Sequence, residues 1–296
     1  MKKNILAMRK FSAFLLALAM ILMNLSINVF AVDSSTNSEL DISEFDTDTI
    51  VTYNVETQEV TYDSYRNIKE SNATSNFNLE NVAAPSSLFP IMDTTDSPYR
   101  NVCYIVATFP NGKVATGSGT LVYFDILLTA AHVVYSNENG GWATTVTVTP
   151  GRTASGSAPF GSTTSTLITA HNEWINNANS NYDWAVVDLA GSFSTWQLYG
   201  YYSDYYNEVG DTVTFIGYPG NVTSAMCTDE GPITSINEYR MHCSLVADYG
   251  MSGGAIIDNK SGYLIGVITA KNSSGTVGIG VRITQLIGDV ILSRRD

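Results

Sequence analysis

The stretch DYGMSGGA, residues 248–255, holds a serine between glycines. A serine hydroxyl is a poor nucleophile near neutral pH, and it needs an adjacent base that a third group orients. Attack on a carbonyl also needs donors aimed at the developing oxyanion. Because glycines permit unusual dihedral angles, the N–H groups of Gly250 and Ser252 could face one side, as an oxyanion hole requires. Ser252 is therefore a candidate nucleophile if the chain also supplies a base and an acid.

The best candidate for the base is His132, in LLTAAHVV. It follows an apolar strand pattern, and the small neighbours Ala130 and Ala131 leave room for a ring that stands in a cleft. The two other histidines are His171, in ITAHNEW, and His242, in RMHCS. Neither belongs to such a motif, so both are expected to be structural.

The candidate for the orienting acid is Asp183, in NSNYDWAVVDL. A polar run ends at this residue and an apolar strand pattern begins, which predicts a partly buried carboxylate at a strand's edge. Asp188 comes five residues later, so it points to the opposite face of the same strand. An aspartate that merely ends a turn is the alternative for Asp183.

The order of the three residues separates two classes of hydrolase. Gly-Met-Ser-Gly-Gly also fits the G-x-S-x-G elbow of α/β-hydrolases, whose chains run serine, acid, histidine. No histidine follows Ser252. The order His132, Asp183, Ser252 instead fits the chymotrypsin-type arrangement.

With these motifs the sequence resembles the chymotrypsin-like serine peptidases, and most of all the bacterial secreted branch that includes the glutamyl endopeptidases. The landmarks are GSGTLV, LLTAAHVV, NYDWAVVDL, GDTVTFIGYPG, GMSGGAII and GYLIGVITA. The resemblance implies an all-β fold of two six-stranded antiparallel β-barrels with a C-terminal helix. It places His132 and Asp183 in the first barrel and Ser252 in the second. It also implies a signal peptide and an N-terminal pro-segment.

Two features depart from the family pattern. The residue before the nucleophile is usually Asp or Asn, and here it is Met251, so activation by an ion pair to that residue cannot occur. Glutamate-cleaving relatives carry a histidine on the strand after the nucleophile, and the matching position is close to the uncharged Ile268. The candidate residues of the substrate pocket are Val246, Ile268, Thr269 and Lys271. Lys271 would favour an acidic side chain if it lies at the rim, and the alternative is a solvated loop lysine.

Composition supports an exported β-rich protein. Only 15% of the 296 residues are charged, and the chain has 17 Tyr and 23 Gly. The formal net charge of −13 argues against nucleic acid or an anionic membrane as the main partner. No CxxC or HExxH motif occurs, so neither a metal nor another cofactor is expected. We expect a protein or peptide substrate and a monomer.

The N-terminal third has its own character. A basic start, a long apolar run and the small residue Ala31 predict a signal peptide over residues 1–31, with a membrane anchor as the alternative. Residues 32–87 are polar and acidic, which predicts weak order for this segment alone and a probable pro-segment, with a linker as the alternative. Within it, TIVTYNV and EVTYDSY could pair as a hairpin. The expected cleavage boundary lies between Asn81 and Asp93.

The remaining residues, 88–296, are expected to form the peptidase domain, since about a dozen short strand patterns are separated by turn residues. The first barrel is predicted over about 95–190 and the second over about 195–280. Apolar residues spaced i, i+3, i+4, i+7 and i+8 from Ile283 predict a helix over about 283–295.

The chain has three cysteines, and export would permit a disulfide. Cys227 and Cys243 flank a stretch that resembles a hairpin, so a bridge between them is possible, and Cys103 would then be unpaired.

The sequence therefore predicts a secreted serine endopeptidase that works through an acyl-enzyme. The alternative is a peptidase fold that has lost catalysis and serves in binding or adhesion.

Overall fold

The computed structural model describes residues 47–66, 87–193, 207–220 and 225–295. These residues belong to one compact unit, Asp46–Asp296. The predicted signal peptide lies outside the described residues.

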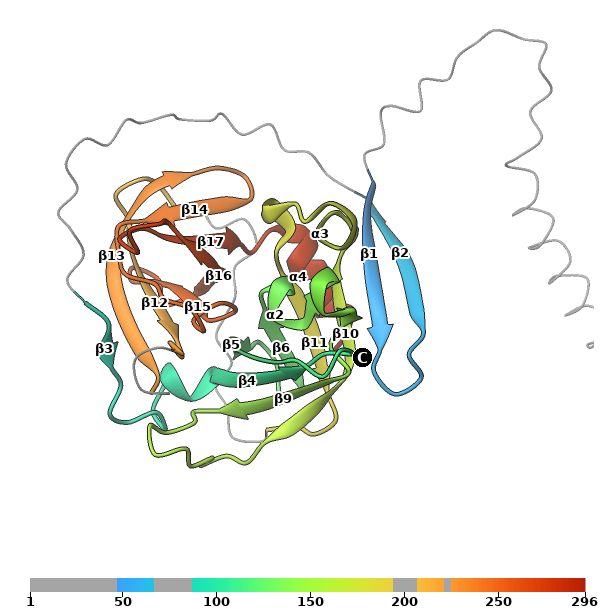
Figure 1. Cartoon of the computed structure of the whole chain (residues 1–296). Coiled ribbons are helices and arrows are strands. Elements are labelled where there is room, and N and C mark those ends of the chain that lie inside the picture. The colour runs from blue at the N-terminus through green and yellow to red at the C-terminus, as the bar shows by residue number, and fades with distance from the viewer. Residues whose placement is uncertain (1–46, 67–86, 194–206, 221–224, 296) are drawn as a thin grey trace, which may run out of the picture. The chain divides into compact units, whose positions relative to one another are not determined.

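The first barrel is a closed ring of six antiparallel strands. Its sheet has the order β11-β6-β5-β4-β9-β10, and a further pairing of β10 with β11 closes the ring (Figure 1). Closure removes most of the free edges that an open sheet would expose, but β9 pairs with β10 only at Thr163 and Thr164. The strands are β4 (Val102–Thr108), β5 (Val114–Leu121), β6 (Ile126–Thr129), β9 (Thr145–Pro150), β10 (Thr163–His171) and β11 (Ala185–Leu189).

The second barrel repeats this plan. Its strands follow the order β12-β15-β16-β17-β14-β13, and β12 pairs with β13 to close the ring. The resemblance predicted two six-stranded antiparallel barrels, and the structure confirms this fold class. The strands are β12 (Thr212–Gly217), β13 (Cys227–Ile236), β14 (Arg240–Cys243), β15 (Ala255–Asp258), β16 (Leu264–Lys271) and β17 (Gly278–Arg282).

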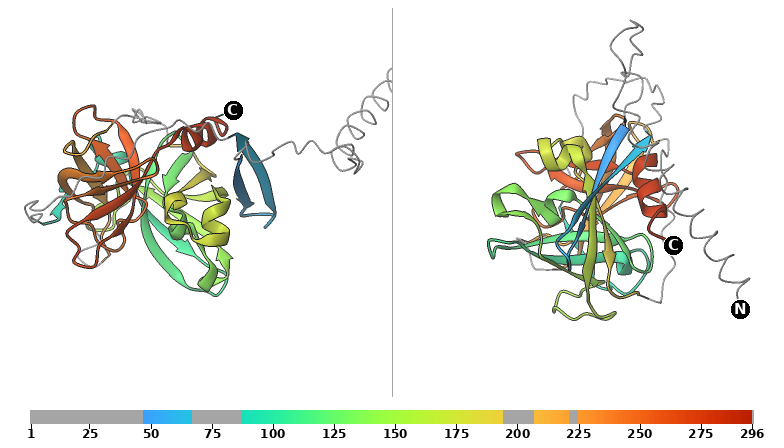
Figure 2. Two further views of the ribbon diagram at one scale, coloured as in Figure 1. Left: turned by 90° about the horizontal axis from the view of Figure 1, so that it is seen from above. Right: turned by 90° about the vertical axis from the view of Figure 1, so that its right-hand side faces the viewer.

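Extra strands attach to both rings. The short β3 (Phe89–Pro90) pairs with β13 of the second barrel. A hairpin of β1 (Thr47–Asn54) and β2 (Val60–Arg66) pairs through β1 with β10 of the first barrel. Figures 1 and 2 show this hairpin, in blue, alongside the first barrel. The two strand patterns noted between residues 47 and 66 thus form the expected hairpin.

Short elements link the strands of the first barrel. They are η2 (Tyr99–Asn101), α2 (Ala131–Val134), β7 (Tyr135–Ser136), η3 (Asn137–Asn139), β8 (Gly141–Trp142), α3 (Asn172–Asn177) and η4 (Ser180–Tyr182). Of these, α2 contains the candidate base His132, and η4 ends directly before the candidate acid Asp183.

The C-terminal helix α4 (Gln285–Leu292) is shorter than the predicted 283–295. Ile283 precedes the helix, and its N–H donates to the carbonyl of Ile265, so this residue continues the sheet. Ile287, Val290 and Ile291 are buried in the same cluster as the core of the first barrel. The helix therefore leads the chain from the second barrel back to the first.

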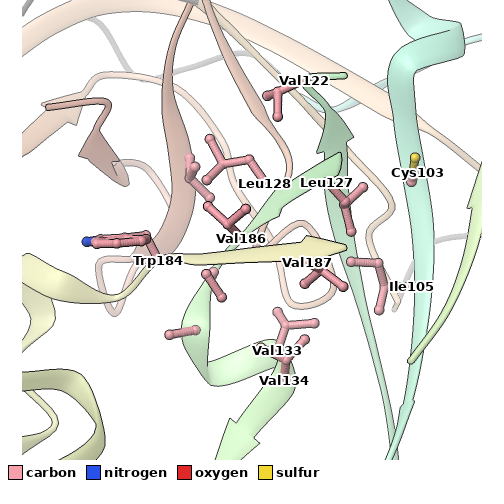
Figure 3. Packing of buried hydrophobic residues seen from close by; sticks show 14 of the residues in the cluster. Cys103, Ile105, Val122, Leu127, Leu128, Val133, Val134, Trp184, Val186 and Val187 are labelled. Carbon is pink, nitrogen blue, oxygen red and sulfur yellow. The ribbon is translucent and has the colours of Figure 1, made fainter. Parts of the chain in front are cut away.

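The core of the first barrel shows why its sequence forms these strands. In β4, the buried residues include Cys103, Ile105 and Ala107, which alternate along the strand as one face of a sheet requires. Figure 3 shows Ile105 close to Leu127 of β6 and Val187 of β11 in this packed interior. Three strands thus meet in one cluster.

The possible bridge between Cys227 and Cys243 is absent, because all three cysteines are free and buried. The register of the β13–β14 hairpin explains this correction. Cys243 lies opposite Ile233, six residues along β13 from Cys227. Strand residues rise about 3.3 Å each, so the two thiols are far beyond bonding distance along the hairpin.

The packing predicts the stability of two matched variants. Ile105→Ala removes a fully buried side chain and should lower the free energy of unfolding by about 2–5 kcal/mol. Val114→Ala, on the neighbouring β5, alters a side chain that is 56% exposed and should change it by less than about 0.5 kcal/mol. Urea unfolding followed by circular dichroism measures both. Equal effects would contradict the assignment of Ile105 to the core.

Candidate active site

The Asp183 carboxylate binds His132 at two places. The His132 ring nitrogen Nδ1 lies 2.8 Å from Asp183 Oδ2, and the His132 backbone N–H donates to Asp183 Oδ1 at 2.9 Å. Asp183 is buried, whereas the side chain of His132 is 35% exposed. This arrangement fixes the ring from its inner side and leaves part of the imidazole open to solvent.

Local backbone structure places both residues. His132 lies in the first turn of α2, where helix N–H groups lack partners within the helix, and Asp183 supplies an acceptor from another part of the chain. Asp183 has φ −77° and ψ 65°, and the N–H of Trp184 donates to the carbonyl of Tyr182 at 2.9 Å. This is an inverse γ-turn, which occurs at strand ends, and it directly precedes β11.

The environment of His132 changes its basicity. Burial alone would lower its pKa, but the charge of Asp183 and the hydrogen bond to it act more strongly together and raise the pKa above the ordinary 6.5. A base with this pKa accepts a proton readily near neutral pH.

Ser252 lies in a turn that only glycines allow. Gly250 and Gly253 have φ of +92° and +88°, in the left-handed region. A Cβ atom on Gly253 would lie 1.9 Å from the carbonyl oxygen of Ser118 and 2.1 Å from Thr129 Oγ1. The turn therefore packs closely against β5 and against the end of β6. The residues that follow β6 carry His132.

Ser118 of β5 fastens this turn to the first barrel. Its N–H donates to the carbonyl of Ser252 at 2.8 Å, and its Oγ donates to the carbonyl of Gly250 at 2.8 Å. The same Oγ accepts a hydrogen bond from the N–H of Tyr218 at 2.8 Å. Ser118 is fully buried, so one hydroxyl ties two segments of the second barrel to the first.

Hydrogen bonds also orient the two predicted oxyanion donors. The carbonyl of Tyr249 accepts from Gly220 N at 2.7 Å, and the carbonyl of Met251 accepts from Gly254 N at 2.9 Å. In a trans peptide the N–H points away from the carbonyl, so the N–H groups of Gly250 and Ser252 point away from these contacts. Neither N–H has an acceptor in the part of the chain that the structure describes.

The structure brings His132 and Asp183 into direct contact, but it does not join Ser252 to His132 in the same way. Within the described ranges, Ser252 Oγ makes no hydrogen bond to His132 or to another group. A Cβ on Gly117 would meet the side chain of Val133, next to His132, and the carbonyl oxygen of Ser252. The backbones that carry the two groups thus pack around the same glycine.

The candidate pocket residues lie on both sides of the turn around Ser252 in the sequence: Val246 precedes it, and Ile268 and Thr269 follow it on β16. Ile268 is bound to this turn, because its carbonyl accepts from Gly253 N at 2.7 Å and its N–H donates to the carbonyl of Gly254 at 3.0 Å. Its side chain is buried, and Thr269 Oγ1 donates to the carbonyl of Ile279. Val246 is half-buried, and its N–H donates to the buried Asp229 carboxylate.

Lys271, at the end of β16, is not a freely solvated loop lysine. Its Nζ lies 2.7 Å from Asp248 Oδ1 and 4.4 Å from the ring centre of Tyr249. Asp248 precedes Ser252 by four residues. The ion pair therefore connects the end of β16 with the loop that precedes Ser252.

Met251, where the family usually has Asp or Asn, is fully buried in the core of the second barrel. A Cβ on Gly217 would lie 3.0 Å from its Cα, so β12 approaches closely at this point. The apolar side chain anchors the turn from inside the second barrel.

The competing residues have other roles. His171 Nδ1 accepts the N–H of Glu173 at the start of α3, and its ring stacks on Tyr182 with centroids 3.9 Å apart. His242 lies in β14, where burial and the charge of Arg240 lower its pKa. Asp188 lies 3.9 Å from Arg294 at the end of the chain, and burial raises its pKa to about 6. None of the three contacts the Asp183 carboxylate through a hydrogen bond.

Sequence reasoning missed Ser118 and Tyr182 as supports of the site. GSGTLV, which contains Ser118, is one of the motifs that carry the family resemblance. A pattern along one strand, however, does not show that its hydroxyl group forms hydrogen bonds with residues of the other barrel. The signal for Tyr182 is its position directly before Asp183, in a polar run that folds as η4.

Two further properties describe the surroundings. A polar cavity of about 220 Å³ is lined by none of the three candidates; its lining residues are Asp48, Thr49, His171, Asn172, Glu173, Asn179 and Tyr182. Among the described residues, no group of three or more His, Cys, Asp or Glu side chains could hold a metal ion.

A helix that crosses a lipid bilayer must be long and apolar. No helix in the described ranges combines the length and the apolar character that are needed to cross it.

Comparison with known proteins identifies the family. A family model described as trypsin-like peptidase domain matches residues 117–267, just over half of the chain. The chain therefore belongs to this family of trypsin-like peptidases.

Two curated relatives are similar over most of the domain. A glutamyl endopeptidase of Bacillus licheniformis is 28% identical over 222 residues, which is 74% of this chain and 66% of the relative. A Bacillus subtilis protein named extracellular metalloprotease is 31% identical over 200 residues, which is 66% of this chain and 63% of the relative. The chain thus spans slightly less than two thirds of the length of each. Since the described residues offer no metal-binding cluster, we assign no step to the metal that the second name implies.

Solved structures share the fold. A Glu endopeptidase in complex with MPD superposes with a TM-score of 0.63 at 24% identity, covering 71% of this chain and 98% of that one. The protease Anisep from Arthrobacter nicotinovorans gives a TM-score of 0.56 at 20% identity, covering 68% and 95%. At these identities the likeness establishes the fold alone.

The contact between Asp183 and His132 predicts a measurable titration. The pKa of His132 should lie above 6.5 in the unmodified protein, and Asp183→Asn should lower it below that value, because the effect of burial then remains without the opposing charge. Imidazole resonances followed by NMR over pH report this pKa. Asp188→Asn is the matched control and should leave the His132 titration unchanged. A His132 pKa below 6.5 in the unmodified protein would contradict the arrangement.

Proposed function

We propose that this protein is a secreted serine endopeptidase that hydrolyses peptide bonds through an acyl-enzyme. Ser252 is the nucleophile, His132 the general base and Asp183 the group that orients the base. The N–H groups of Gly250 and Ser252 form the oxyanion hole. Membership of the trypsin-like peptidase family supports a protein or peptide substrate.

The observation that carries this proposal is the double contact of Asp183 with His132. A carboxylate at Nδ1 keeps the proton on that nitrogen, so Nε2 is left as the basic atom. The second oxygen binds the backbone N–H of the same residue, and this prevents the ring and its backbone from moving independently. Within the described residues, Nε2 of His132 makes no hydrogen bond and the side chain is partly exposed, so this nitrogen is available to take a proton.

The reaction follows from these positions. His132 Nε2 takes the hydroxyl proton as Ser252 Oγ forms a bond to the carbonyl carbon. The resulting oxyanion accepts hydrogen bonds from the N–H groups of Gly250 and Ser252. His132 then gives the proton to the leaving amine, and the C–N bond breaks. Water attacks the acyl-enzyme with His132 again as the base, and Ser252 recovers its proton.

The proposal does not require a hydrogen bond between Ser252 Oγ and His132 before substrate binds. Catalytic hydrogen bonds are often long or misaligned in free enzymes and tighten in the substrate complex. Ser252 Oγ sits on a side chain with one rotatable bond, whereas its backbone is fixed by Ser118. A rotation of that side chain is the smallest change that could bring the hydroxyl to the base.

Export and maturation belong to the same proposal. Residues 1–31 act as the signal peptide, and residues 32–87 form a pro-segment whose removal leaves residues 88–296 as the peptidase domain. The curated relative from Bacillus subtilis is named as an extracellular protein. We expect the mature protein to be a monomer.

Substrate preference is proposed to depend on Lys271. One relative is named for glutamyl cleavage, but in this chain Val246 and Ile268 carry no charge. Lys271 at the end of β16 forms an ion pair with Asp248, four residues before Ser252. An acidic substrate side chain can take the place of Asp248 at the ammonium group, so a preference for such side chains is weakened but not removed by the ion pair.

Ser252→Ala should abolish hydrolysis of a casein or peptide mixture. Loss of the nucleophile costs at least about 10⁴-fold in rate. The variant should also no longer be labelled by a serine-directed phosphonate, which mass spectrometry detects. The measurement needs a preparation free of contaminating proteases, because the residual rate is small.

Ser273→Ala is the matched control, since Ser273 lies exposed in the turn after β16. It should keep both activity and labelling. If the Ser252 variant is still labelled and still active, the assignment is wrong. If the purified mature protein is not labelled at all, the chain is a non-catalytic binding module.

Two substitutions at the ion pair test the preference. Asp248→Asn should raise the ratio of kcat/KM for glutamate over leucine before the cleaved bond, and Lys271→Met should lower it, each by about 5-fold or more. A peptide library assayed with each variant measures the ratio. Lys260→Met, an exposed lysine in the turn after β15, is the control and should not change it. An unchanged ratio in both test variants would exclude Lys271 from the pocket.

A further inference from the structure

The first barrel leaves part of one strand edge for a partner from outside the ring. β9 pairs with β10 only at Thr163 and Thr164. From Leu167 to His171, the same edge of β10 pairs with β1 instead, while β11 occupies the other edge. An unpaired strand edge exposes backbone donors and acceptors and is a template for strand addition.

The strand that fills this edge is embedded rather than laid on the surface. Ile50 and Val51 are both only 1% exposed, although adjacent residues of a strand face opposite sides. The Tyr53 ring stacks on Trp142 with centroids 5.6 Å apart and an angle of 3° between the planes. β2, by contrast, is largely exposed, with Tyr62 at 66%. β1 therefore behaves as part of the core.

Polar contacts fix the position of β1 along β10. The Asp48 carboxylate lies 3.0 Å from His171 Nε2. Arg294, just after α4, donates from Nη2 to Thr52 Oγ1 and to Thr169 Oγ1, both at 2.7 Å. A shift by one residue would reverse the two faces of β1 and break all of these contacts.

The same contacts reach the catalytic acid. The His171 ring that meets Asp48 also stacks on Tyr182, and the carbonyl of Tyr182 closes the turn around Asp183. The docked hairpin is thus separated from the Asp183 turn by two aromatic side chains.

We propose that the β10 edge from Leu167 to His171 is a strand-binding site whose occupant is the chain's own hairpin, residues 47–66. The hairpin remains bound there as a separate peptide when the backbone between it and Leu88 is cut. Cleavage of the backbone then leaves a complex of two fragments, and removal of the pro-segment requires dissociation of the hairpin as a separate, later step. This binding does not require peptidase activity, so its failure and the failure of the proposed function are distinguishable.

A cut that does not depend on the natural maturation tests the binding. The full-length chain carries Ser252→Ala, which prevents self-digestion, and a recognition sequence for a site-specific protease is inserted within residues 67–86. After cleavage, gel filtration and native mass spectrometry are carried out without denaturant. We expect both fragments in one species with their summed mass. Separation of the hairpin fragment from the larger fragment would overturn the proposal.

Matched variants locate the binding at β1. Val51 and Tyr62 face each other across the hairpin, so Val51→Asp and Tyr62→Asp place the same charge on its buried and its exposed strand. Val51→Asp should weaken retention at least about 100-fold, because a buried carboxylate without a partner is strongly unfavourable. Tyr62→Asp should leave retention unchanged.

A second, milder variant keeps the test valid if the Val51→Asp protein does not fold. Asp48→Asn removes the charge that faces His171 and should weaken retention by about tenfold. Circular dichroism after cleavage verifies that the larger fragment stays folded. Retention of Val51→Asp and Asp48→Asn as tight as that of the unmodified hairpin would also overturn the proposal.

Discussion

The candidate site depends on one tie between the barrels, made by Ser118. The candidate base and acid, His132 and Asp183, belong to the first barrel and the candidate nucleophile, Ser252, to the second, so their alignment depends on the contact between the two barrels. Ser118 binds the carbonyls of Gly250 and Ser252 on one side and the N–H of Tyr218 on the other. Being buried, these bonds do not compete with water, and breaking one would leave an unsatisfied polar group. The hydrogen bonds of Ser118 therefore hold the turn around Ser252 in a fixed position on β5.

A second constraint sets the chemistry of the base. Asp183 is buried and bound to both the ring and the backbone of His132, so its charge is compensated by the group that it orients. Burial lowers the pKa of the His132 imidazole, and the charge of Asp183 together with the hydrogen bond to it raises this pKa by more. The inverse γ-turn at Asp183 makes this possible, because it turns the chain just before β11 enters the core.

The hairpin of residues 47–66 changes how the segment before the peptidase domain is understood. Its composition is that of a polar linker, yet β1 is buried on both faces once it pairs with β10. A segment that would be weakly ordered alone gains its order from an edge that the barrel leaves open. The same hairpin meets His171 and, through it, Tyr182, so the support of the acid extends outside the closed ring.

From the sequence by itself, strand and turn patterns predicted a β-rich domain and the β1–β2 hairpin, because alternation and turn residues are local properties. The order of three motifs gave His132, Asp183 and Ser252 as candidates, and the family that this order resembles supplied the two six-stranded barrels. The sequence overestimated the length of the final helix, because Ile283 fits the helical spacing but continues the sheet. It also allowed a bridge between Cys227 and Cys243, which the register of β13 and β14 separates. Only the tertiary structure decided which strand fills the β10 edge, that Lys271 meets Asp248 and that Ser118 joins the barrels. Each of these is a contact between segments distant in the chain, and its geometry is set by packing and register, which no local pattern encodes.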